Sequence, residues 1–148
     1  LVSNLIGAGR PDEVAPTILR HLRIAYIVVL PLALLFSLFP EFILSIYTDI
    51  PELITASIPS LWVMCASFLF QIPGHVYFLS VSGTGNTQKA FILELIALVF
   101  YVSYITYVIL ILRMDVAFCW TAEVVYGSCV FLFSYLYIRN GSWRKKRI

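Results

Sequence analysis

The stretch Ala90–Leu112, AFILELIALVFYVSYITYVILIL, contains 23 residues and a single charge, Glu94. As an α-helix it would be about 34 Å long, because each residue adds about 1.5 Å. The hydrocarbon core of a bilayer is about 30 Å thick, so roughly 20 apolar residues can cross it. The stretch therefore predicts a helix that spans a membrane.

Three more stretches have the same character. The expected spans cover residues 19–39, 53–81, 90–112 and 116–138. Of the 148 residues, 61% are hydrophobic and 12% are charged, against about 25% charged in an ordinary soluble domain. A soluble protein of this length could not bury so much apolar surface. We therefore predict an all-α, polytopic transmembrane helix bundle, with the lipid bilayer as its partner.

The basic residues gather on one set of connections. Nine of the ten lie there, namely Arg10, Arg20, Arg23, Lys89, Arg139, Arg144, Lys145, Lys146 and Arg147. The opposite connections carry one basic residue and several acidic ones, namely Arg113, Glu41, Asp49, Glu52 and Asp115. Basic residues near span ends favour the cytoplasm. We therefore expect both ends to be cytoplasmic, in a multi-pass protein of the plasma (inner) membrane.

The basic tail, residues 139–148, is expected at the inner membrane surface. Trp143 and the Arg144–Arg147 run would anchor it there, because anionic lipid is the nearest binding partner for such charges. We therefore do not expect nucleic acid as a partner.

Glu94 and Glu123 are the only charges inside the last two expected spans, and they are candidate ion-coupling residues. A charged carboxylate at the centre of a spanning helix costs about 2.5–3.5 kcal/mol on insertion scales. Such residues usually face a bundle interior or a watery cavity and often serve ion or proton paths. The alternative is that each carboxylate lies near a membrane face and is solvated there.

Pro73 and Gly74 predict a local helix break in the second span, since proline lacks an N–H donor and glycine weakens a helix. Broken membrane helices often line binding sites. Gln71 and His75 flank the break and are candidate residues of a substrate cavity. The alternative is a proline kink that serves packing.

Tyr101 and Tyr104 are further cavity candidates, because they share one broad side of the third span. They would line an aromatic cavity for a flat, lipophilic substrate, although packing or an interfacial belt also fits this pattern. We expect no metal site, since the histidines and cysteines lack ligand spacing. The spans also lack the nucleophile–base set of a membrane-embedded enzyme.

Two glycine motifs follow apolar runs, Gly7-Ala8-Gly9-Arg10 and Gly83-Thr84-Gly85-Asn86. Neither has the third glycine or the Lys-Ser/Thr of a phosphate-binding loop. Glycines just past a helix end supply the left-handed backbone of a C-cap, and we predict that role here.

Three stretches together resemble the multidrug and toxic compound extrusion (MATE) transporters. They are VSNLIGAGRPDEV (residues 2–14), SVSGTGNTQKA (residues 80–90) and the tail AEVVYG…YLYIRNGSWRKKRI (residues 122–148). The resemblance covers nearly the whole chain in order. It implies the carboxyl-terminal third of a twelve-helix protein, from the end of the eighth helix to the twelfth.

The resemblance implies secondary active efflux of cationic or lipophilic drugs or metabolites, in antiport with sodium or protons. It also implies alternating access between two lobes, no cofactor besides the coupling ion, and two partners, a small-molecule substrate and the missing amino-terminal helices. Many members carry an acidic residue midway along the helix that matches residues 53–81, and this chain has none between Leu53 and Lys89. Either Glu94 takes over ion coupling or coupling resides in the missing lobe.

Two other functions remain as alternatives. A flippase for lipid-linked saccharides, from the same superfamily, would need Arg and Lys inside its spans to hold pyrophosphate, and the span interiors here have none. A non-catalytic membrane anchor or assembly subunit is also compatible with a partial chain. A catalytic role is not expected.

Overall fold

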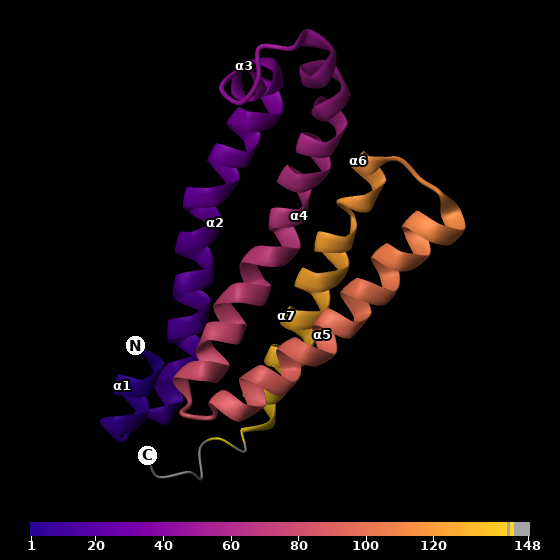
Figure 1. Cartoon of the computed structure of the whole chain (residues 1–148). Coiled ribbons are helices and arrows are strands. Elements are labelled where there is room, and N and C mark those ends of the chain that lie inside the picture. Colours follow the sequence, from indigo (N-terminus) through magenta and orange to yellow (C-terminus); the bar gives the residue numbers. More distant parts are fainter. Residues whose placement is uncertain (142, 144–148) are drawn as a thin grey trace.

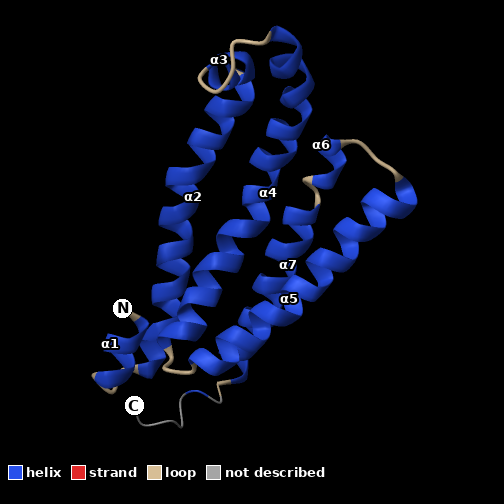
Figure 2. Ribbon diagram, in the orientation of Figure 1, coloured by secondary structure: helices blue, strands red, loops and turns tan. Residues whose placement is uncertain are grey.

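The computed structural model describes residues 1–141 and Trp143, and in these residues the chain is helical without strands (Figure 2). In chain order the elements are α1 (Val2–Gly7), a 3-10 turn (Pro11–Glu13), α2 (Val14–Leu38), α3 (Pro40–Ser45), α4 (Pro51–Gly83), α5 (Thr87–Tyr107), a π-helical turn (Val108–Leu112), α6 (Val116–Cys119) and α7 (Ala122–Asn140).

Four helical segments are long and apolar enough to cross a membrane. They are Pro11–Leu38, Pro51–Gly83, Thr87–Leu112 and Val116–Asn140. The predicted all-α membrane bundle is therefore confirmed. Many large apolar side chains on α2 and α5 are exposed, as expected where lipid rather than protein covers a helix.

The fourth span is interrupted, whereas the sequence predicted one continuous helix. A turn at Trp120 and Thr121 separates α6 from α7. Backbone bonds here join each N–H to the carbonyl three residues back, with Glu123 N to Trp120 O at 3.1 Å and Thr121 N to Phe118 O at 3.0 Å. This 3-10 pattern tightens the backbone. Before it, the side chain of Asp115 accepts from the backbone N–H of Phe118 at 2.9 Å and caps α6.

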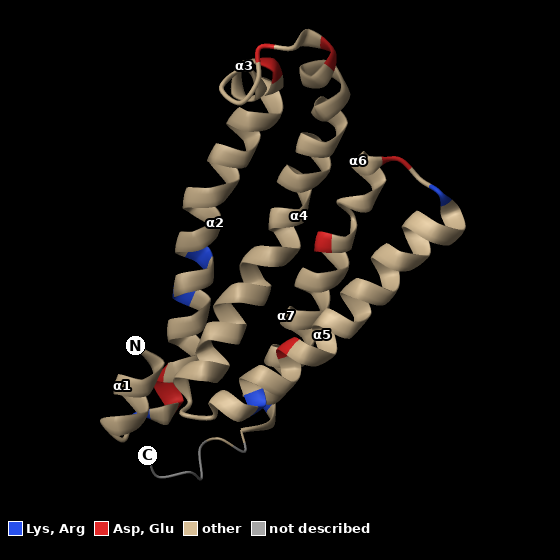
Figure 3. Cartoon of the chain, viewed as in Figure 1, with Lys and Arg blue, Asp and Glu red and all other residues tan. Residues whose placement is uncertain are grey.

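The two ends of the bundle differ (Figure 1). Leu1, the α4–α5 connection and the last turn of α7 lie at one end, and α3 and the α5–α6 connection lie at the other. Figure 3 shows few charged residues along the middle of the helices and acidic residues around α3 and the start of α4. The structure thus places the chain end at Leu1 and the GTGN loop on the same side.

The helix α4 does not break at Pro73 and Gly74, so that prediction is wrong: the helix runs on through both residues. Pro73 lacks the N–H that would bond to the carbonyl of Leu69. The hydroxyl of Tyr26, on α2, donates to that carbonyl at 2.8 Å instead. A hydrogen bond from the neighbouring helix replaces the missing one, and the backbone stays helical.

Glycines end three of the helices. Gly9, Gly85 and Gly141 have φ angles of 71°, 77° and 65°, in the left-handed region that favours glycine. The predicted C-cap role of the two glycine motifs is confirmed, and in each motif the second glycine provides it.

The main hydrophobic core lies where α1, α2, α4 and α7 meet. Its fully enclosed residues include Val14, Ile18, Val81 and Trp143. Trp143 is 2% exposed and donates to the carbonyl of Ile138 at 2.9 Å, so it packs inside the protein rather than anchoring the tail at the membrane surface. The Arg144–Arg147 run lies outside the described residues.

We predict that Asn86 and Thr48 lie on opposite sides of the membrane, because they occupy opposite ends of the bundle and the basic connections favour the cytoplasm. In Asn86→Cys and Thr48→Cys variants, an impermeant thiol reagent should label only Thr48→Cys from outside intact cells. Both should label in opened cells. Labelling of both positions from outside would contradict this topology.

Candidate functional site

A polar cluster joins α4, α5 and α7 in the middle of the bundle. We call it the carboxylate cluster, and it consists of Gln71, Glu94, Tyr101, Glu123 and Tyr126. All five side chains are half-buried. Four of them are candidates from the sequence, and the structure brings these four together with Tyr126.

The pair Gln71–Glu123 connects α4 with α7. The side-chain amide Nε2 of Gln71 donates to Glu123 Oε2 at 2.6 Å. The backbones of the two helices touch close to this bond. A Cβ added to Gly74 would lie 2.9 Å from the carbonyl oxygen of Gly127, and one added to Gly127 would lie 2.9 Å from the backbone nitrogen of Gln71. Because neither glycine has a side chain, α4 and α7 come close enough for the amide of Gln71 to reach the carboxylate of Glu123.

Glu94, on α5, is also bound by a residue of α7. The hydroxyl of Tyr126 donates to Glu94 Oε1 at 3.1 Å. The ring of Tyr126 also meets the ring of Tyr101 edge to face, with centroids 5.9 Å apart. Tyr101 and Glu123 line the same hollow. Glu94 is thereby linked, through Tyr126 and Tyr101, to the hollow that Glu123 also lines.

Tyr126 is the site residue that the sequence analysis missed. It lies three residues after Glu123, and residues at this spacing share one side of a helix. Tyrosine is abundant in the chain, with nine copies, so one more inside an apolar run gave no signal by itself. The spacing from Glu123 was the clue that could have identified it.

The other cavity candidates lie apart from the cluster. Tyr104 pairs with Thr121 Oγ1 at 2.8 Å. Because the hydroxyl of Thr121 donates to the carbonyl of Phe118 at 2.6 Å, the proton between the two hydroxyls comes from Tyr104. This bond ties α5 to the turn between α6 and α7. His75 is exposed, and its Nδ1 is 3.1 Å from the carbonyl of Gln71.

Two hollows flank the Gln71–Glu123 bond. One, of about 240 Å³, lies among α5, α6 and α7 and is lined by Tyr101, Trp120 and Glu123 together with Ile105, Val116 and Cys119. The other lies between α2 and α4, is mostly apolar, and has Gln71 and His75 in its wall. Tyr101 and Gln71 thus each line a hollow, as cavity residues would, whereas Tyr104 lines neither of the two.

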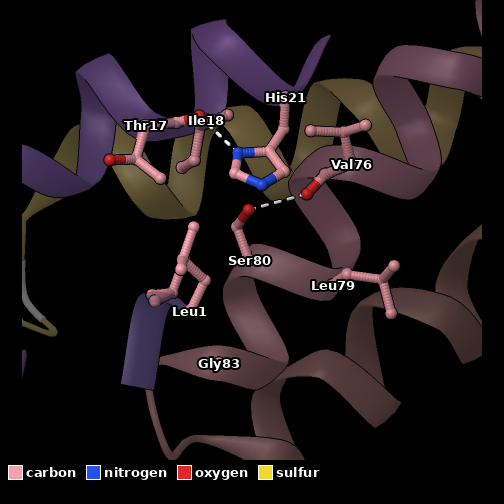
Figure 4. A pocket seen from close by; sticks show the side chains of 9 residues that line it. Leu1, Thr17, Ile18, His21, Val76, Leu79, Ser80 and Gly83 are labelled. Atoms are coloured by element: carbon pink, nitrogen blue, oxygen red, sulfur yellow. Dashed lines mark hydrogen bonds between the residues drawn. The ribbon is translucent and has the colours of Figure 1, made fainter. Parts of the chain in front are cut away.

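A third hollow, at the Leu1 end of the bundle, lacks the features of a site (Figure 4). Two of its polar side chains bond to their own helices. The hydroxyl of Ser80 donates to the carbonyl of Val76 at 2.7 Å, and His21 Nδ1 is 2.8 Å from the carbonyl of Thr17. The remaining wall is apolar, so the carboxylate cluster is the better candidate.

The model of the MatE family matches residues 1–112. The chain belongs to the MatE family. No curated protein and no solved structure matches it.

Membership of the MatE family makes this chain a multi-pass membrane protein of a transporter family. The match includes α1 to α5 and ends at the π-helical turn. Gln71, Glu94 and Tyr101 lie within the matched region, whereas Glu123 and Tyr126 lie beyond it. The site in this MatE chain therefore combines matched residues on α4 and α5 with residues of α7 outside the match.

We predict that Gly127→Ala destabilises the protein by about 1–3 kcal/mol, because the new Cβ would press against the backbone of α4 at 2.9–3.1 Å. The apparent melting temperature in detergent should fall. Gly7→Ala is the matched control, since a Cβ there meets nothing within 4 Å. Equal melting temperatures for the two variants would contradict the close crossing of α4 and α7.

Proposed function

We propose that the chain takes part in secondary active efflux of cationic or lipophilic compounds, driven by sodium or protons, with Glu94 as the coupling carboxylate. The observation that carries this proposal is the position of Glu94. It is half-buried in a span with no other charge between Ala90 and Leu112, and its bonding partner is the hydroxyl of Tyr126.

Charge neutralisation gives Glu94 a way to couple an ion to movement. An ionised carboxylate is costly in apolar surroundings, and uptake of a proton or a sodium ion removes that cost. The neutral form can therefore occupy a packed environment that the charged form avoids. An ion gradient then biases the equilibrium between two conformations, as differential binding requires.

Glu123 is less suited to that role. The amide of Gln71 holds it at 2.6 Å, and a hydrogen bond to an ionised group is typically the stronger kind. Replacement of Glu123 by glutamine would keep an acceptor for Gln71. We therefore assign ion coupling to Glu94 and a secondary role to Glu123.

The hollow beside Tyr101 supports a cationic, lipophilic substrate. Aromatic rings attract cations at their faces, and Tyr101, Trp120 and the carboxylate of Glu123 line the same space. A saccharide flippase has less support, because the sequence has no Lys or Arg from Ile24 to Gln88, from Ala90 to Leu112 or from Met114 to Ile138.

The four spans would form the last part of a twelve-helix transporter in the plasma (inner) membrane, with both ends of the chain in the cytoplasm. The amino-terminal helices would supply the opposite lobe, because alternating access needs two lobes that move about a shared site.

We predict that Glu94→Gln abolishes most gradient-driven efflux in the intact protein while expression and substrate binding persist. Glutamine keeps the shape and the acceptor for Tyr126 but fixes the neutral state. Dye efflux from energised vesicles, measured at several proton and sodium gradients, would test this. Glu123→Gln is the matched control and should reduce efflux less. If Glu94→Gln pumps like the parent at every gradient, coupling resides elsewhere.

We also predict that residues 1–148 expressed alone give no resistance to cationic dyes in a pump-deficient host. Four spans cannot form both lobes of an alternating-access transporter. Growth in dye compared with the empty vector measures this. Resistance above the vector would mean that the four-span unit is sufficient, for example as an oligomer.

A further inference from the structure

Pro73 creates an unusual requirement in the middle of α4. In a helix the N–H of residue 73 would bond to the carbonyl of residue 69, and proline has no N–H. The carbonyl of Leu69 therefore needs another donor. Lipid offers none, and an unsatisfied backbone group inside a membrane costs several kcal/mol.

Tyr26 meets this requirement from a different helix. Its hydroxyl donates to the carbonyl of Leu69 at 2.8 Å. Tyr26 is half-buried on α2. A second bond, from Trp62 Nε1 to the carbonyl of Ser37 at 3.1 Å, joins the same two helices. Because the partner on α4 comes earlier in the chain as the residue on α2 comes later, the two helices pack antiparallel. The position of α2 thus determines whether Leu69 has a partner.

The turn of α4 that Tyr26 holds also makes the contacts to α7. Gln71 lies two residues after Leu69 and donates to Glu123 at 2.6 Å. Gly74 lies one residue after the proline and touches the backbone of Gly127. Residues 69–74 are therefore fixed from both sides, by α2 through one hydroxyl and by α7 through an amide and a backbone contact.

We infer that Tyr26 is a positioning residue for the carboxylate cluster, although its hydroxyl bonds to Leu69, which is not one of the cluster's members. By supplying the donor that Pro73 lacks, it fixes the turn that directs Gln71 to Glu123. On the side that faces α2, a single side-chain bond takes the place of the backbone bond that Pro73 lacks. When α2 shifts against α4 this bond breaks, and the turn then keeps its contacts to α7 but loses its hold from α2.

This inference rests on the proposed function only for its effect on transport. The interaction between Tyr26 and Leu69 can be tested separately through stability, because it depends on Pro73. Pro73→Ala restores the backbone donor to Leu69 and makes the hydroxyl redundant. The two substitutions should therefore not be additive.

The experiment compares four forms of the intact protein: the parent, Tyr26→Phe, Pro73→Ala and the double variant. The apparent melting temperature in detergent and the rate of ethidium efflux from energised vesicles are measured for each. Tyr26→Phe should lower the melting temperature and slow efflux roughly tenfold in the parent, since a polar group loses its partner. In the Pro73→Ala background it should change neither quantity.

Tyr104→Phe is the matched control. It also removes one tyrosine hydroxyl bond between helices, but to the side chain of Thr121 rather than to a carbonyl left free by proline. Its effects should be the same with and without Pro73→Ala. If the effect of Tyr26→Phe is also the same with and without Pro73→Ala, the inference is overturned.

A third background separates positioning from plain stability. Gln71→Leu removes the bond to Glu123, so Tyr26→Phe should no longer slow efflux there but should still lower the melting temperature. If Tyr26→Phe affects only the melting temperature in the parent, the bond is structural and the positioning role fails, while the proposed function stands. If the parent shows no gradient-driven efflux, the proposed function and the positioning role both fail, and the melting temperatures still test the Tyr26–Leu69 bond.

Discussion

The contact between Gly74 and Gly127 is the constraint on which the centre of this bundle depends. Helices in lipid gain nothing from hydrophobic burial against each other, so close backbone approach at small residues has to hold them. With no Cβ at either position, α4 and α7 run side by side and in parallel. The register that follows pairs Gln71 with Glu123 on one side of the contact, and Tyr77 with Phe131 on the other, at a ring distance of 5.4 Å.

The way in which polar groups inside the spans pair with one another follows from that register and from the lack of water in lipid. Gln71 meets a carboxylate, Glu94 meets a hydroxyl, and the carbonyl freed by Pro73 meets Tyr26. Each of these bonds joins two different helices, and each is the kind of contact that membrane helices use in place of solvation. The bonds that satisfy single groups are therefore also the bonds that set the arrangement of α2, α4, α5 and α7.

The sequence predicted the parts of this structure that depend on composition. Span number, the pairing of ends and the glycine caps at Gly9 and Gly85 follow from apolar length and from backbone sterics, which are local properties. The continuity of α4 did not follow, because the donor that replaces the Pro73 N–H lies 47 positions earlier on another helix. The same holds for the candidate site. Glu94 and Glu123 stand out by their charge, whereas Tyr126 and Tyr26 become visible only once the helices are packed.

The two carboxylates lie on helices that are joined to their neighbours in different ways. Glu123 lies on α7, which is locked to α4 by the glycine contact and by Gln71. Glu94 lies on α5, which the structure joins to α7 and the adjoining turn by two hydroxyl bonds, from Tyr126 at 3.1 Å and from Tyr104 at 2.8 Å. Neither bond involves a backbone contact as close as that at Gly127. Under the proposed function, a change of charge at Glu94 would act first on α5, whose bonds to α7 and the adjoining turn are made by hydroxyl groups rather than by a close backbone contact.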